Sequence, residues 1–140
     1  FTDEDLKVQQ VAADAVKNAN AAIDEIAIQD AITSVWTLVD ELNNYITVQQ
    51  PWVLAKDEAN TERLGTVLNT TAEGLRALAV LLNPVVPKAA EKLWSALVGD
   101  SAELAAQPLD EAGVWGQLKV GSKIGQLEAL FPRVETEETK

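Results

Sequence analysis

Apolar and polar residues alternate with the period of an α-helix through the first third of the chain. Neither Gly nor Pro occurs before Pro51, and the apolar spacing predicts helix over residues 1–48. Thr2 and Asp5 have the spacing of a capping box at the start of this region. Because a single helix of this length is unusual, we expect a break within residues 18–25 or a little later.

The second half of this region has the clearest amphipathic pattern in the sequence. Its predicted inward residues share one helix face, and they are Ile28, Ile32, Val35, Val39, Leu42 and Ile46. Trp36 lies beside this stripe and is expected in the core. Pro51 interrupts the pattern, so residues 49–56 are interpreted as a turn between two helices.

A further helix is predicted from about Asn60 to Leu82, where an Asn-Pro pair ends it. Its expected inward residues are Leu64, Val67, Leu68, Leu75, Leu78 and Leu82. Gly65 and Gly74 lie within it, and each lowers helix stability by roughly 1 kcal/mol relative to Ala. We expect close packing against a neighbouring helix at both positions.

The next predicted helix runs from Pro87 to Gly99. Its inward residues are Ala90, Leu93, Trp94 and Leu97. Closely spaced Gly and Pro residues then favour one short helix near 101–107, followed by irregular structure in which Trp115 is a packing anchor.

We therefore predict an all-α fold. The whole of 1–140 is interpreted as one antiparallel helical bundle domain. Residues 1–99 supply the main helices, and residues 100–140 form an irregular extension with a C-terminal helix or tail.

Composition excludes several kinds of chemistry. The chain has no Cys and no His, which excludes disulfides and removes the commonest general base and metal ligand. It has no membrane-length apolar run and no signal peptide, so we expect a cytoplasmic protein without a membrane partner. With 11 basic and 22 acidic residues, the net charge of −11 disfavours a broad basic surface for nucleic acid. Because residue 1 is Phe, we expect a piece of a longer protein.

No catalytic residue, metal or cofactor is expected in this chain. Adjacent acidic pairs such as Asp40 and Glu41 point in different directions on a helix, which is typical of a solvated acidic face. A di-metal carboxylate site, the least favoured alternative, needs inward Glu and His residues, and the predicted stripes contain neither. The glycine-flanked loop 121–125 lacks the spacing of a phosphate-binding loop and is interpreted as a turn.

One group of residues has the chemistry needed to bind an unpaired base. Asn43 and Asn44 lie near the end of the second helix, and Trp52 follows Pro51 in the predicted turn. An aromatic ring can stack on a base, which contributes about 1–3 kcal/mol, and side-chain amides can bind base edges. The alternative is that Trp52 only plugs the end of the bundle.

The same residues carry a resemblance to a known family. The string from Asn43 to Lys56, with its Asn-x-Tyr-Ile and Pro-Trp-x-x-Ala-Lys elements, resembles the anticodon-binding domain of methionyl-tRNA synthetases. The match ends on Leu-Phe-Pro-Arg-Val at residues 130–134 and spans about residues 35–134. The landmarks between are Leu75-Arg76, the run from Leu82 to Pro87, Trp115, Leu118, Gly121 and Ile124.

The resemblance implies a role in RNA recognition. It implies a bundle that docks beside a class I catalytic domain and recognises the CAU anticodon of tRNA(Met). The parent enzyme would attach methionine to this tRNA with ATP bound in its catalytic domain. Trp52 would stack on an anticodon base, and Pro51 would fix the turn that presents it. Asn43 and Asn44 would line the same end of the bundle.

The chain departs from the family pattern in two respects. Thr47 stands where many bacterial relatives carry an acidic residue, so a contact made by that carboxylate is missing or replaced. The family's Asn-x-x-x-Arg helix and its ATP-binding motifs fall outside this sequence, so we expect part of the anticodon site and none of the chemistry. Tyr45 is expected to pack inward, and residues 131–133 to pack back along the bundle. The alternative function is a helical protein-interaction module without RNA binding.

Overall fold

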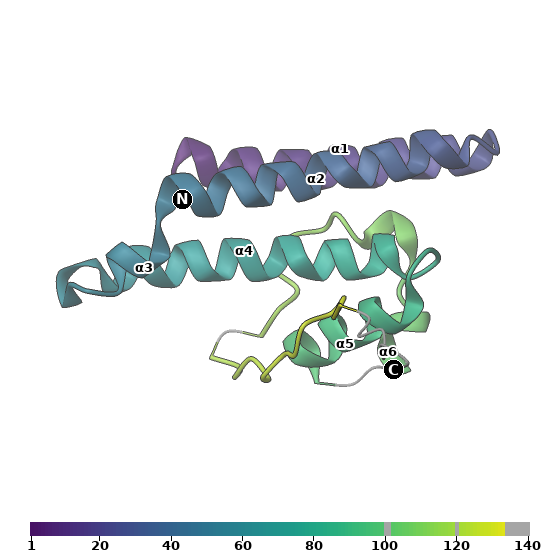
Figure 1. The fold of residues 1–140 in the computed structure, drawn as a ribbon. Coiled ribbons are helices and arrows are strands. Elements are labelled where there is room, and N and C mark those ends of the chain that lie inside the picture. Colours follow the sequence, from purple (N-terminus) through teal and green to yellow (C-terminus); the bar gives the residue numbers. More distant parts are fainter. Residues whose placement is uncertain (100–101, 120, 134–140) are drawn as a thin grey trace, which may run out of the picture.

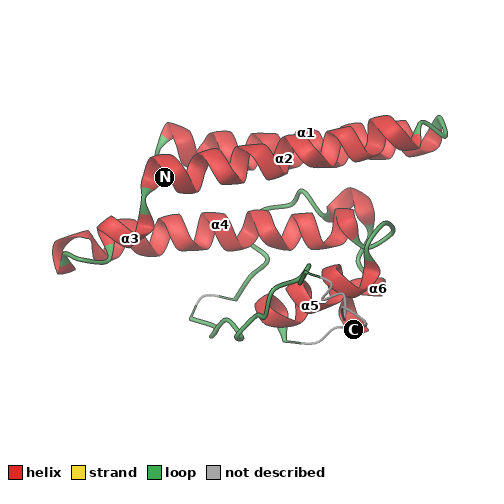
Figure 2. Ribbon diagram, in the orientation of Figure 1, coloured by secondary structure: helices red, strands yellow, loops and turns green. Residues whose placement is uncertain are grey.

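Helices account for all the regular structure in the part of the chain that is described, as the sequence predicts (Figure 2). The computed structural model describes residues 1–99, 102–119 and 121–133. In chain order the elements are α1 (Asp3–Asp24), α2 (Ile28–Gln49), α3 (Pro51–Leu54), the 3-10 helix η1 (Glu58–Asn60), α4 (Thr61–Leu82), α5 (Pro87–Val98), α6 (Ala102–Ala105) and the 3-10 helix η2 (Leu109–Glu111). None of these described helices is long and apolar enough to span a bilayer.

The helix α4 is the centre of the bundle. In Figure 1 the antiparallel pair α1 and α2 lies along one side of α4, and α5 lies on the other side. All four helices α1, α2, α3 and α5 contact α4. Because neighbours surround it, nearly every residue from Thr70 to Leu81 is buried, rather than a single stripe.

The helices α1 and α2 form a tight antiparallel hairpin. The break between them falls at residues 25–27, at the late end of the predicted range, and Ile26 has a positive φ of 60° there. The capping box predicted for Thr2 and Asp5 is present at the start of α1. Small buried residues let the two helices approach closely, and on α1 these are Ala12, Ala15, Ala19 and Ala22.

The helix α2 turns a different face inward from the predicted one. Its buried residues are Ala31, Val35, Leu38, Leu42 and Tyr45. Only Val35 and Leu42 of the predicted stripe are buried, whereas Ile28 and Ile32 are exposed. Trp36 is 58% exposed, so its expected place in the core is wrong. The physical reason is that α2 packs against both α1 and α4, which rotates its buried face and leaves Trp36 outside it.

The two glycines of α4 have different surroundings. A Cβ atom on Gly74 would lie 2.5 Å from a methyl group of Leu42, so this glycine permits the close approach of α2 and α4. A Cβ atom on Gly65 would meet no atom within 4 Å, so the close packing predicted there is wrong. Leu68, also predicted to face inward, is half exposed because α4 is fully covered only from Thr70 onward.

A buried ion pair attaches the irregular C-terminal segment to α4. Nε of Arg76 donates to Oε2 of Glu73 at 2.9 Å, and Nη2 of Arg76 donates to the carbonyl oxygens of Ala112 and Val114. The second carboxylate oxygen of Glu73 accepts the backbone N–H of Leu118 at 2.6 Å. This pair corrects the expectation that no Glu faces inward. Arg76 neutralises the charge of Glu73 within α4, so the apolar residues around this carboxylate keep their helical spacing.

The C-terminal segment is mostly extended. Trp94 is buried and Trp115 packs against the core, as predicted for both. The short helix predicted near 101–107 is α6, although Ser101 lies outside the described residues. Residues 121–133 contain no described helix, so the expected C-terminal helix is not found there, and residues 134–140 lie outside the described ranges. Residues 131–133 are all exposed, with Phe131 at 73%, so their predicted packing along the bundle is wrong; the preceding Leu130 is the residue that packs against the core.

Candidate functional site

The end of α2 and the start of α4 are joined by residues 50–60, which we call the α3 corner (Figure 1). Gln50 has a left-handed backbone conformation, with φ of 47° and ψ of 62°, which is strained for a residue with a side chain. Pro51 follows as the first residue of α3, where its fixed φ suits a helix start. The predicted turn 49–56 therefore contains a four-residue helix, which is too short for periodicity to reveal.

Trp52 projects from the α3 corner into solvent. Its side chain is 55% exposed, and that of the neighbouring Val53 is 46% exposed. Neither α3 nor η1 contains a buried residue. A Trp that plugged the bundle would be buried, so the alternative interpretation of Trp52 as a plug is wrong. The ring is available to stack on a ligand.

The polar residues expected to join Trp52 are exposed on the last two turns of α2, and they are Asn43, Asn44 and Thr47. Asn43 and Thr47 lie one turn apart on the same face, and the Thr47 hydroxyl donates to the Asn43 carbonyl oxygen at 2.8 Å. Asn44 points about 100° further around the helix. Within the described residues, no hydrogen bond joins these side chains to Trp52. The fold thus brings the five predicted residues, Pro51 included, to one end of the bundle.

A buried polar cluster that the sequence did not reveal lies at the base of the corner. The carboxylate of Asp5 is fully buried and accepts hydrogen bonds from both Nη atoms of Arg63, at 2.6 and 3.0 Å. It also accepts the Tyr45 hydroxyl and the Thr2 backbone N–H. Nη2 of Arg63 donates in addition to Oε1 of Gln49 at 2.7 Å. The starts of α1 and α4 and the end of α2 therefore meet on one ion pair.

The cluster changes the acidity of its members. Burial acts to raise the pKa of Asp5, but hydrogen bonds from Arg63, Tyr45 and Thr2 outweigh it and hold that pKa far below its ordinary value. Burial and the hydrogen bond to Asp5 raise the pKa of Tyr45 to about 12. Hydrogen bonding to Asp5 also raises the pKa of Arg63. At neutral pH the cluster therefore contains a carboxylate, a neutral phenol and a guanidinium. Tyr45 faces inward, as predicted.

The α3 corner offers little positive charge. Lys56 is exposed and forms no ion pair with any described residue, whereas Lys7 on nearby α1 pairs with Glu41 at 2.7 Å. Asp57 is used locally, because its carboxylate accepts the backbone N–H of Ala59 at 3.0 Å. A ligand at this corner would therefore be held by the Trp52 ring and by amide groups more than by charge.

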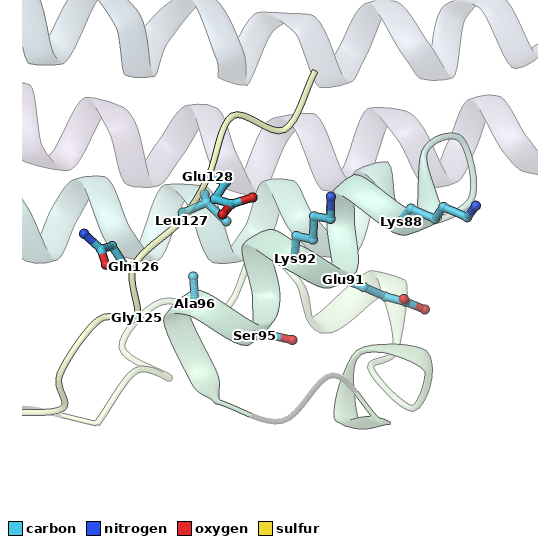
Figure 3. Close-up of a pocket in the computed structure, with 9 residues that line it drawn as sticks. All are labelled: Lys88, Glu91, Lys92, Ser95, Ala96, Gly125, Gln126, Leu127 and Glu128. Atoms are coloured by element: carbon cyan, nitrogen blue, oxygen red, sulfur yellow. The ribbon is translucent and has the colours of Figure 1, made fainter. Parts of the chain in front are cut away.

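A wide surface depression of about 530 Å³ lies away from this corner, between α5 and residues 125–128 (Figure 3). Two lysines, Lys88 and Lys92, stand there with Glu91 and Glu128, so the charges balance. Figure 3 shows the side chains of Lys88, Glu91 and Lys92 pointing in different directions rather than converging on one point. The depression has no feature that selects a particular ligand.

An exposed apolar surface lies around the first half of α2, away from the α3 corner. Two shallow cavities there, of about 200 and 190 Å³, share Ile32, Val35 and Val85. We define the apolar face by Ile32, Trp36, Val85 and Phe131, all of which are exposed. Contiguous exposed apolar surface of this kind is typical of an interaction site.

The carboxylates in the described part of the chain do not form a metal site. No group of three or more Asp, Glu, His or Cys side chains comes together in the described ranges. The buried carboxylates of Asp5 and Glu73 are each bound by a guanidinium. What the arrangement offers is therefore a binding surface at the α3 corner.

Comparison with known proteins identifies a consistent set of relatives. Residues 1–140 match a family described as the anticodon binding domain of methionyl tRNA ligase. The chain is 42% identical over 126 residues to the methionine–tRNA ligase of Streptomyces coelicolor, covering 86% of this chain and 23% of that protein. It is 39% identical over 137 residues to the Bacillus subtilis enzyme, covering 98% of this chain and 20% of that protein.

A solved structure has a similar fold. The apo form of Mycobacterium tuberculosis methionyl-tRNA synthetase superposes with a TM-score of 0.82 at 30% identity, over 97% of this chain and 27% of that chain. The chain thus spans about a fifth to a quarter of the length of these relatives.

Proposed function

The chain belongs to the family of anticodon-binding domains of methionyl-tRNA ligases, and on that basis we propose that its α3 corner recognises the CAU anticodon of tRNA(Met). Trp52 supplies the stacking surface, and Asn43 and Asn44 supply amide groups for the edges of unpaired bases. Pro51 fixes the start of the helix that carries Trp52. The observation that carries the proposal is the 55% exposure of this ring on a corner without buried residues.

The chemistry of the corner suits unpaired bases more than a phosphate backbone. The net charge is −11, and Lys56 is the exposed cation of the corner, so counterion release contributes little to binding. Stacking on one Trp contributes about 1–3 kcal/mol. The Thr47 hydroxyl donates its proton within α2, and its oxygen remains an acceptor for an amino group on a base.

The proposal is tested by RNA binding to the 140-residue chain, measured by fluorescence anisotropy. The probes are a labelled stem-loop with a CAU anticodon and the same stem-loop with other anticodons. We expect a preference for CAU, and we expect Trp52→Ala to lower CAU affinity by about 5- to 150-fold.

Trp36→Ala is the matched control, because Trp36 is about as exposed as Trp52 but lies on the apolar face. We expect it to bind the CAU stem-loop like the unaltered chain. Equal losses of affinity in the two variants, or no loss in Trp52→Ala, contradict the proposal.

We further propose that the chain works as part of a cytoplasmic methionine–tRNA ligase, which attaches methionine to tRNA(Met). ATP and the catalytic groups are assigned to the part of the ligase outside this sequence, since the sequence covers about a fifth of its relatives. The apolar face suits contact with that catalytic part. In the complete ligase, Trp36→Ser should lower aminoacylation while the stem-loop affinity of the 140-residue chain stays unchanged.

The alternative function, a helical interaction module without RNA binding, is not favoured by the family match over residues 1–140. It also makes a different prediction about salt. A protein partner held by apolar contacts should be much less sensitive to salt than an RNA.

A further inference from the structure

The α3 corner carries Trp52 but has little packing of its own. Neither of its two short helices contains a buried residue, and Gln50 holds a strained left-handed conformation at its start. The corner's contact with the core is the partly buried Leu54, on the side of α3 that faces α4, so the segment takes much of its position from the elements at its two ends. The location of Trp52 therefore depends on how the end of α2 is held against the start of α4.

One side chain joins these two ends. Arg63, in the first turn of α4, donates from Nη2 to Oε1 of Gln49, the last residue of α2, at 2.7 Å. The two residues are 14 positions apart, and the α3 corner lies between them. This hydrogen bond closes the base of the corner.

Arg63 is itself held by a partner that cannot move. The Asp5 carboxylate is 0% exposed, and it accepts from both Nη atoms of Arg63. Tyr45 and the Thr2 backbone fill the remaining acceptor positions of that carboxylate. The two hydrogen bonds to Asp5 therefore fix the plane of the Arg63 guanidinium independently of its hydrogen bond to Gln49.

Arginine has a geometry that lysine cannot reproduce. Its guanidinium presents several N–H groups in one rigid plane, so one Nη atom can serve Asp5 and Gln49 together. A lysine at this position would keep the charge and one contact but lose the fixed fork.

We propose that Arg63 is a positioning residue for anticodon recognition, which sets the place of Trp52 relative to the exposed amides of α2 through Gln49 and Asp5. This inference rests on the function proposed above. Arg63 stabilises the fold in any case; what the inference adds is that the bond to Gln49 determines the geometry of the binding surface.

The test uses two variants of the 140-residue chain, Gln49→Ala and Arg63→Lys. Gln49→Ala removes one partly buried hydrogen bond and leaves the Asp5–Arg63 pair intact, so this variant is expected to fold. Arg63→Lys keeps Gln49 available to RNA, so it separates positioning from direct contact. The matched controls are Gln10→Ala, at an exposed position of α1, and Arg133→Lys, in the C-terminal segment.

Two quantities are measured for each variant. The first is affinity for the CAU stem-loop and for a stem-loop with another anticodon. The second is the ¹⁹F resonance of Trp52 in the free protein labelled with 5-fluorotryptophan, assigned with Trp52→Phe. We expect both variants to lose about tenfold in CAU affinity, with little change for the other stem-loop, and to shift the Trp52 resonance without RNA. The controls should change neither quantity.

The outcomes distinguish this inference from the function on which it rests. If the unaltered chain prefers CAU while both variants keep its affinity and its Trp52 resonance, the positioning role of Arg63 is wrong and the function stands. If Trp52→Ala binds the CAU stem-loop as tightly as the unaltered chain does, the proposed function is wrong, and the inference fails with it.

Discussion

The hydroxyl of Tyr45 donates a hydrogen bond to the carboxylate of Asp5, a buried residue 40 positions earlier in the chain. This contact links the end of α2 to the first turn of α1, and Arg63 extends the link to α4. Asp5 therefore has two roles, because the carboxylate that caps α1 also joins three helices. Its ionisation should be coupled to the stability of the whole bundle.

Stability should fall in acid because of Asp5. The pKa of Asp5 is lower in the folded chain than its unfolded value near 3.8, so the unfolded state takes up this proton first as the pH falls. The contribution of Asp5 is fully present above this value and is lost as the pH decreases toward the folded pKa. Denaturant unfolding followed by circular dichroism at a series of pH values measures this loss.

Asp5→Asn is the variant that tests the acid prediction. It should unfold more easily at neutral pH, by about 1–3 kcal/mol, because Arg63, whose side chain is 26% exposed, loses its charged hydrogen-bond partner. It should also show a shallower decline of stability in acid than the unaltered chain. An equally steep decline in both proteins would show that other carboxylates are responsible.

Stability should also fall in strong base because of Tyr45. Its pKa of about 12 lies above the unfolded value of 10.0, so its contribution is complete below the unfolded value and is lost as the pH rises through the folded one. Tyr45 is the only Tyr in the sequence, so tyrosinate absorbance reports this group alone. A titration midpoint near the unfolded value in the folded protein would contradict the buried hydrogen bond.

The two glycines of α4 should respond in opposite directions to substitution by Ala. Gly65→Ala meets no neighbouring atom and should raise the free energy of unfolding by about 0.5–1 kcal/mol, through helix propensity. Gly74→Ala places a methyl group against Leu42 and should lower stability, because overpacking costs about 1–3 kcal/mol. Thermal or denaturant unfolding of the two variants side by side measures the difference. A gain at both positions would mean that α2 and α4 can separate freely.

Glu73→Gln should release the C-terminal segment from α4. The substitution leaves Arg76 as an unpaired buried charge and places an amide group near the N–H of Leu118. Loss of one partner of a buried ion pair lowers the free energy of unfolding by about 3–5 kcal/mol. Hydrogen exchange should increase in residues 112–118 more than in α1. Glu62→Gln, at an exposed position of the same helix, is the control. It should change neither the free energy of unfolding nor the hydrogen exchange of residues 112–118.

Lys56→Gln should change the salt dependence of RNA binding rather than its specificity. If Lys56 contacts a phosphate, its loss reduces the slope of log affinity against log salt by about one unit and weakens all stem-loops alike. Anisotropy titrations at several salt concentrations give the slope. Lys17→Gln on α1 is the control, and an unchanged slope for Lys56→Gln would place this lysine outside the interface.

The positions of the helices could be predicted from sequence because local signals determine them. Pro87 begins α5, and the Thr2–Asp5 capping box begins α1, whereas the four-residue helix α3 that starts at Pro51 lies in a segment predicted to be a turn. The buried faces were harder to predict, because counting a stripe assumes that a helix has one neighbour. The helix α2 packs against both α1 and α4, which leaves Trp36 exposed, and α4 is fully covered only from Thr70 onward, which leaves Leu68 half exposed.

The candidate site was predicted in part. Trp52 and the amides of α2 followed from the chemistry of their side chains and from the resemblance to a family. The cluster at the base of the corner was missed because capping already explained Asp5. A signal was present in Arg63, since a cation in the first turn of a helix is disfavoured by the helix dipole unless a partner compensates it. Such a cation indicates a carboxylate from elsewhere in the chain.

Stability of the fold and binding of a ligand often place conflicting requirements on the same residues. At the α3 corner these requirements fall on different residues, because α3 and η1 contain no buried residue. Folding at this end of the molecule depends on Asp5, Tyr45 and Arg63, which lie beneath the corner, whereas the groups offered directly to a ligand belong to residues that the core does not use. Substitutions on that surface should therefore leave the free energy of unfolding almost constant. Under the function proposed above, evolution or protein design could alter anticodon preference at the α3 corner without first stabilising the scaffold.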